Sequence, residues 1–82
     1  MSNESSEVIG IVIDMTDKEC PAVLFELKVS MAKIKVGEIL KLITNRPKSQ
    51  KNIPKWCLNN NHELFLMDSS NGKYIFYIKR KH

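Results

Sequence analysis

The sequence predicts an α+β domain: a two-layer sandwich with two helices on one face of a four-stranded mixed sheet. Short apolar runs of strand length alternate with two stretches of helical spacing, in the order β-α-β-α-β-β. Asn71-Gly72, the strongest hairpin signal in the chain, separates the last two runs. A chain of 82 residues supports one core, so we expect a single domain over residues 1–82, with 1–7 flexible.

The first strand is expected at Val8–Ile13, a β-branched run that is apolar on both faces, which predicts a central position in the sheet. Pro21 suits the first turn of a helix, because the N–H that proline lacks is unpaired there in any case. Gly37, a few residues after Ile34, is expected to end this helix. Apolar residues recur along this helix at steps of three and four: Leu24, Leu27, Met31 and Ile34.

Ile39–Thr44 predicts a second strand, and a strand–helix–strand order of this length favours parallel pairing with the first. Ser49 is a candidate N-cap for the second helix. Pro54 is tolerated only in a first turn, so the helix is expected to begin near residues 50–53 and to end at Asn59–Asn61. One stripe of this helix holds Ile53, Trp56, Cys57 and Asn60.

The final strands, Leu64–Met67 and Tyr74–Ile78, are expected to pair antiparallel. Both alternating sets of side chains in this hairpin contain apolar groups, so one set must point away from the helices. An apolar patch on that face would favour docking or self-association. We therefore expect a monomer or a weak homodimer.

The composition, 43% hydrophobic and 27% charged, is that of a globular protein. No apolar run reaches the roughly 20 residues of a membrane span, and the start does not resemble a signal peptide. We expect a cytoplasmic protein that does not contact membranes.

The net charge of +4 is unevenly distributed, because the first 26 residues carry six acids against one lysine and the rest holds +9. This basic part suits an acidic partner or a polyanion, although solvated lysines on a basic protein would give the same pattern. Between residues 41 and 55 the basic side chains are Lys41, Arg46, Lys48, Lys51 and Lys55.

The two cysteines differ in position. Cys57 lies beside Trp56 on the apolar stripe of the second helix and is expected in the core. Cys20 directly precedes Pro21, which predicts the N-cap of the first helix, an exposed site where free amides and the helix dipole favour a thiolate. Lys18 adds to that effect and Glu19 opposes it.

The two cysteines, His62 and His82 are not spaced as metal ligands, so the sequence predicts no zinc site.

Five motifs match one family in order and spacing. They are Cys20-Pro21-Ala22-Val23, Gly37-Glu38, Pro47-Lys48-Ser49, Ile53-Pro54-Lys55-Trp56-Cys57 and His62-Glu63-Leu64. From about Val8 to Arg80 the chain resembles the TusA/SirA family of small sulfur-carrier proteins, whose β-α-β-α-β-β fold agrees with the order of elements predicted above.

The resemblance implies that Cys20 accepts sulfane sulfur as a persulfide, or a related thiol adduct, from a protein donor and passes it to a protein acceptor. Such relays serve tRNA thiolation, cofactor assembly or sulfur metabolism, and the carrier needs no metal, nucleotide or other cofactor. A group carrier of the sulfurtransferase type is expected rather than a turnover enzyme. Lys18, Glu19 and Pro21 would support the motif. The partner-binding residues would be Arg46, Lys48, Lys51 and Lys55.

The sequence departs from the family pattern at three places. Val23 replaces the second proline of the motif, and Asp17-Lys18 stands where Gly-Leu is usual. The second helix is flanked by basic rather than acidic residues. Two alternatives stay open: a basic module that binds RNA or the ribosome, and a carrier-like interaction subunit without sulfur chemistry.

Overall fold

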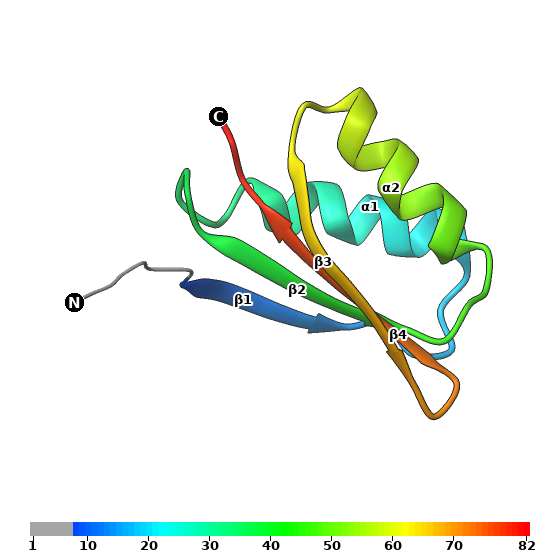
Figure 1. Cartoon of the computed structure of the whole chain (residues 1–82). Coiled ribbons are helices and arrows are strands. Elements are labelled where there is room, and N and C mark those ends of the chain that lie inside the picture. Colours follow the sequence, from blue (N-terminus) through cyan, green and yellow to red (C-terminus); the bar gives the residue numbers. More distant parts are fainter. Residues whose placement is uncertain (1–7) are drawn as a thin grey trace.

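The computed structural model describes residues 8–82, and the expectation that residues 1–7 are flexible lies outside this range. The α+β fold class is confirmed, with two helices packed on one face of a four-stranded mixed sheet (Figure 1). The elements are β1 (Ile9–Asp14), α1 (Cys20–Met31), β2 (Ile39–Thr44), α2 (Ser49–Asn59), β3 (Glu63–Ser70) and β4 (Lys73–Lys79).

The strands lie in the order β1-β2-β4-β3. β1 and β2 pair parallel, as expected, and the other two neighbouring pairs are antiparallel. The predicted central position of the first strand is wrong, because β1 is an edge strand. Ile11 and Ile13 pack toward the core, whereas Ile9 and Val12 remain 46% and 54% exposed. Apolar residues on both faces of a short run therefore did not mean burial on both faces.

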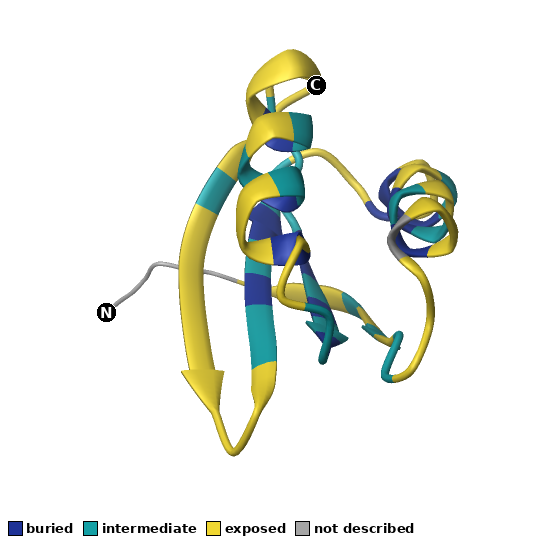
Figure 2. Cartoon of the chain, turned by 90° about the vertical axis from the view of Figure 1, so that its right-hand side faces the viewer, coloured by how far each residue is buried: buried dark blue, intermediate teal, exposed yellow. Residues whose placement is uncertain are grey.

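The core lies between the helices and the helix-facing side of the sheet (Figure 2). α1 supplies Val23, Leu27 and Met31, and the sheet supplies side chains that are neighbours across the β2–β4 ladder. The largest fully buried side chain among the described residues is Phe76. The strand and helix contributions to this core, apart from α1, are Leu40, Leu42, Ile53, Cys57, Phe76 and Ile78.

The second helix begins earlier than expected. Ser49 is its first residue and Lys48 its N-cap, so the predicted cap at Ser49 is wrong. The Ser49 side chain is buried, and its hydroxyl has no hydrogen-bond partner among the described residues. Pro54 consequently lies in the second turn. Because proline has no N–H, the backbone carbonyl of Gln50 lacks its helical hydrogen bond, and Gln50 is exposed. The predicted end is confirmed, with Asn60 as C-cap and Asn61 at φ 58°.

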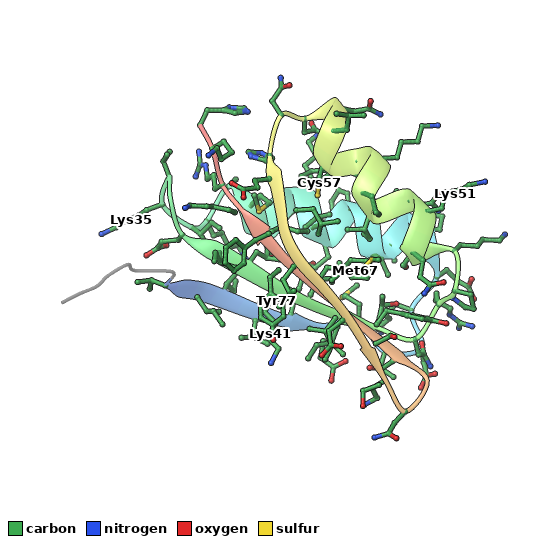
Figure 3. All side chains as sticks on the ribbon, viewed as in Figure 1. Lys35, Lys41, Lys51, Cys57, Met67 and Tyr77 are labelled. Atoms are coloured by element: carbon green, nitrogen blue, oxygen red, sulfur yellow. The ribbon has the colours of Figure 1, made fainter. Side chains whose placement is uncertain are left out.

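The side of the sheet away from the helices carries apolar groups, as the hairpin pattern predicts. Leu66 is 52% exposed there, opposite Tyr77. Lys41 lies over the Tyr77 ring, with its Nζ 5.7 Å from the ring centroid (Figure 3). This cation partly covers the aromatic surface, and such contacts contribute about 0.5–1 kcal/mol at exposed sites.

The hairpin turn has Asn71 at φ 53° and Gly72 at φ 78°. Two positive φ angles are what a two-residue turn of this kind requires, which confirms the interpretation of Asn71-Gly72. No helix within residues 8–82 is long and apolar enough to cross a membrane.

Candidate functional site

The first helix begins at Cys20, which is its first residue rather than its N-cap. Glu19 is the N-cap: its backbone is extended (φ −72°, ψ 155°), and its carbonyl oxygen accepts a hydrogen bond from the Val23 N–H at 3.0 Å. The predicted N-cap assignment of Cys20 is therefore wrong by one residue. The backbone of Cys20 still belongs to the first turn, and its side chain is outside what the structure describes.

Among the described side chains, the N-cap residue, Glu19, provides no capping hydrogen bond for this helix start. The first turn contains no acidic residue. No acidic side chain within the first turn itself compensates the partial positive charge of the helix N-terminus, and the carboxylate of the N-cap Glu19 lies 3.4 Å from Arg46 Nη2. Pro21 follows as the second helical residue and contributes no donor. This environment favours an anion next to the helix start.

The loop that leads into Cys20 is tied to the loop between β2 and α2. Asp17 adopts φ 66°, a left-handed conformation that is easy for glycine and uncommon for other residues. Its N–H donates to Asn45 Oδ1 at 2.8 Å, and Asn45 Nδ2 donates to Asp17 Oδ1, also at 2.8 Å. The position where the family usually has glycine thus keeps a glycine-like backbone.

Arg46 joins the same two loops. Its Nε donates to the Lys18 carbonyl at 3.1 Å, and its Nη2 donates to the Asp17 carbonyl at 3.2 Å. The same Nη2 lies 3.4 Å from the Glu19 carboxylate. One guanidinium therefore holds three consecutive residues just before Cys20, a geometry that the single ammonium of a lysine cannot reproduce.

A pocket of about 260 Å³ lies against this helix start. Its lining includes the residues on either side of Cys20 in the chain, together with basic residues from the β2–α2 loop. The complete lining is Glu19, Pro21, Arg46, Pro47 and Lys48. Four predicted site residues thus meet at one place, although the sequence separates Glu19 and Pro21 from Arg46 and Lys48 by more than 20 positions.

The remaining predicted residues lie nearby or along α2. Lys18 contributes its backbone carbonyl to Arg46. Lys51 and Lys55 are exposed on α2 and do not line this pocket. With Lys48 they follow steps of three and four, which places the three ammonium groups along one face of the helix (Figure 3 labels Lys51).

Cys57 faces inward from α2, as predicted, and is 2% exposed. Figure 3 shows its side chain between α2 and the sheet. Burial raises the pKa of this thiol to about 12. At neutral pH Cys57 is a neutral, enclosed thiol, so it is unsuited to nucleophilic attack.

Sequence reasoning missed Asn45 and the double role of Arg46. The available signal was Asp17 in a usual glycine position, which indicates a left-handed backbone that needs support. It also missed an aromatic stack at the far end of α2, where His62 lies between Trp56 and His82. Nothing in the local sequence brings residue 82 to residue 62.

Comparison with known proteins gives one family model, described as sulfurtransferase TusA, that matches residues 11–80. A sulfur carrier protein TusA from Pseudomonas putida (strain W619) is 30% identical over 70 residues, covering 85% of this chain and 88% of the relative. A TusA from Pseudomonas paraeruginosa is 29% identical over 73 residues, covering 89% and 92%.

Among solved structures, a SirA-like protein from Desulfitobacterium hafniense superposes with a TM-score of 0.76. The match covers 88% of this chain and 99% of that protein, at 19% sequence identity. At this identity the likeness concerns the fold, and it agrees with the four-stranded sheet and two helices described above.

Proposed function

Since the chain belongs to the TusA family of sulfur carriers, we propose that Cys20 is the residue that bears the sulfur, in a cytoplasmic relay between a protein donor and a protein acceptor. The observation that supports this most directly is the position of Cys20 as the first residue of α1, in a turn without a side-chain cap or an acidic residue. A thiolate at this position gains from the helix dipole by about 0.3–1 kcal/mol.

The transfer is a thiol–persulfide exchange. The Cys20 thiolate attacks the terminal sulfur of a persulfide on the donor, and a new S–S bond forms while the S–S bond of the donor breaks. The donor leaves as a thiolate, and the terminal sulfur with its proton stays on Cys20. The acceptor thiolate repeats the same step, so the two transfers need no external oxidant or reductant.

The other cysteine of the chain supports the assignment by contrast. Cys57 is buried and keeps its proton up to high pH, so the second thiol of the chain does not compete for sulfur. The 260 Å³ pocket at the helix start is lined by Glu19 and Pro21, the chain neighbours of Cys20, and offers room for a donor or acceptor segment.

The partner surface is basic. Arg46 and Lys48 line the pocket next to Cys20, and Lys51 and Lys55 continue the positive charge along α2. Complementary charges steer association and select partners more than they increase final affinity. We therefore infer that the docking partners present acidic surfaces, and that their binding weakens as salt increases.

The proposal is tested by incubating the protein with a cysteine desulfurase and cysteine, followed by intact-mass analysis. Wild type is expected to gain the mass of one sulfur atom, which a reductant removes. Cys20→Ser should gain nothing. Cys57→Ala, the matched control that keeps Cys20, should gain the adduct as wild type does.

Two results would overturn the proposal. One is the absence of any adduct on wild type with several donors, including a rhodanese loaded from thiosulfate. The other is an unchanged adduct on Cys20→Ser. The first result would favour a carrier-like interaction subunit without sulfur chemistry, and the second would show that another residue bears the sulfur.

A further inference from the structure

At the end of α1 that lies away from Cys20, a second pocket of about 210 Å³ opens among α1, α2 and the C-terminal residues. With a rise of about 1.5 Å per residue, Met31 lies roughly 16 Å along the helix from its start. The two pockets share no lining residue. The lining of this second pocket is Lys28, Met31, Ala32, Trp56, Asn60, His62, Arg80 and His82.

The lining is basic. Four of its eight residues are Lys28, His62, Arg80 and His82, and none of the eight has an acidic side chain. The four bases come from three separate parts of the chain, since only Arg80 and His82 are close in sequence, and folding brings these parts together. Lys28 and Arg80 carry positive charge with no acidic side chain among the lining residues, and a bound anion would offset this charge.

Arg80 is held at the rim by the protein itself. Its Nη1 donates to the Ile34 carbonyl, and its Nε donates to the backbone oxygen of His82, the last residue, at 2.8 Å. A guanidinium has five N–H groups, so these two bonds fix its plane and leave donors for a ligand. The fork geometry of arginine suits the oxygens of a phosphate or carboxylate.

The two imidazoles are also ordered. His62 and His82 stack with ring centroids 4.7 Å apart and an interplanar angle of 11°. Trp56 also stacks on His62, with ring centroids 5.7 Å apart. The Lys81 N–H donates to His62 Nδ1 at 3.2 Å, so the proton of the neutral ring is on Nε2. The His82 Nε2–H donates to the Asn60 carbonyl at 3.0 Å.

The electrostatics of His62 agree with this geometry. Its pKa is lowered by burial first, and then by the charges of His82 and Arg80. The nearby acid, Glu63, lies 3.4 Å from Lys81, with which it forms an ion pair, and does not line the pocket. An anion among these groups would oppose the repulsion that lowers the pKa, so its binding should raise the pKa of His62.

We propose that the pocket formed by Lys28, His62, Arg80 and His82 binds a phosphate-type oxyanion, either free inorganic phosphate or the phosphate of a small metabolite. This site is distinct from the helix start that bears Cys20, and its ligand is held by charge and N–H donors without covalent chemistry. Binding is therefore independent of the sulfur transfer proposed above.

The test is an NMR titration of the full chain at constant ionic strength, with inorganic phosphate, adenosine 5′-monophosphate and adenosine as three separate probes. We expect saturable shifts of the His62 and His82 rings and the Arg80 Nε–H with phosphate or the nucleotide, at a Kd of roughly 1 mM or below. Tighter binding of the nucleotide would assign the site to a phosphorylated metabolite, and equal binding to the free ion.

Matched charge variants make the test specific. Lys28→Gln removes one lining charge from an exposed position and should weaken binding by about threefold to tenfold. Lys33→Gln removes the same charge from an exposed residue just beyond α1 that does not line the pocket, and should bind as wild type does. His82→Asn disrupts the stack and should also weaken binding.

Three outcomes would overturn the proposal. The first is the absence of saturable shifts with either phosphate-containing probe. The second is equal binding by adenosine, which has no charge. The third is equal weakening in Lys28→Gln and Lys33→Gln, which would indicate general attraction to a basic protein instead of a site.

Discussion

Asp17 and Asn45 exchange two hydrogen bonds of 2.8 Å each, across 28 positions in sequence. The exchange holds Asp17 at φ 66°, a conformation that costs a residue with a side chain roughly 1 kcal/mol or more. The conformation of the loop ahead of Cys20 thus depends on Asn45, the residue that directly follows β2.

This pairing predicts the effect of removing Asn45. Asn45→Ala loses both hydrogen bonds and should lower the free energy of unfolding by about 1–2 kcal/mol, since each bond contributes about 0.5–1.5 kcal/mol. Urea denaturation followed by circular dichroism measures the change. Asp17→Gly is the informative comparison, because glycine loses the side-chain bond but takes the positive φ without strain. An equal loss in Asp17→Gly and Asp17→Val would argue against a backbone role for this position.

The charges beside Cys20 predict opposite effects on its reactivity. Glu19→Gln removes the negative charge adjacent to Cys20 and should increase its alkylation rate at neutral pH. Arg46→Gln leaves Glu19 unpaired and should decrease it. Both groups are solvent-exposed, so we expect changes of about two- to fivefold. Iodoacetamide kinetics on Cys57→Ala versions of each variant isolate the Cys20 signal. Changes in the same direction would contradict this electrostatic account.

Burial of Cys57 predicts that it is inert in the folded protein. Its pKa of about 12 and its 2% exposure leave almost no accessible thiolate. Native wild type should therefore take up one equivalent of iodoacetamide, Cys20→Ser none, and both should gain one more in denaturant. Because folding raises the pKa from 9.0, the unfolded chain releases its proton first, and stability should fall as pH rises through 9 toward 12. Rapid native labelling of Cys20→Ser would refute this prediction.

The lowered pKa of His62 predicts a loss of stability in acid. The unfolded chain binds a proton near pH 6.5, whereas the folded chain binds it only at lower pH. The contribution of His62 is therefore fully present above about pH 7 and is lost as pH falls through the folded pKa. Urea midpoints at about pH 7.5 and about pH 5 should differ more for wild type than for His62→Asn. An identical pH dependence in the two proteins would exclude His62 as the cause.

Local chemistry in the sequence determined the order and type of the elements. β-branched runs, apolar steps of three and four, and the Asn71-Gly72 turn depend on neighbours within a few positions, and each predicted element is present. The same reasoning placed Cys57 in the core and Cys20 at a helix start. It was wrong by one residue on the cap of each helix, since Glu19 and Lys48 hold those places. Helix ends depend on a few hydrogen bonds that propensity does not resolve.

Only the tertiary structure decided which distant residues meet. An apolar run such as Ile9–Asp14 is compatible with either a central or an edge strand. In the folded sheet β1 is an edge strand, because β4 pairs with the other side of β2. The bonds from Asn45 and Arg46 to the loop before Cys20, and the gathering of His62 with His82, likewise arise from packing between segments far apart in the chain. Such contacts involve side chains whose sequence separation carries no periodic signal, so they become visible only once the sheet and helices are assembled.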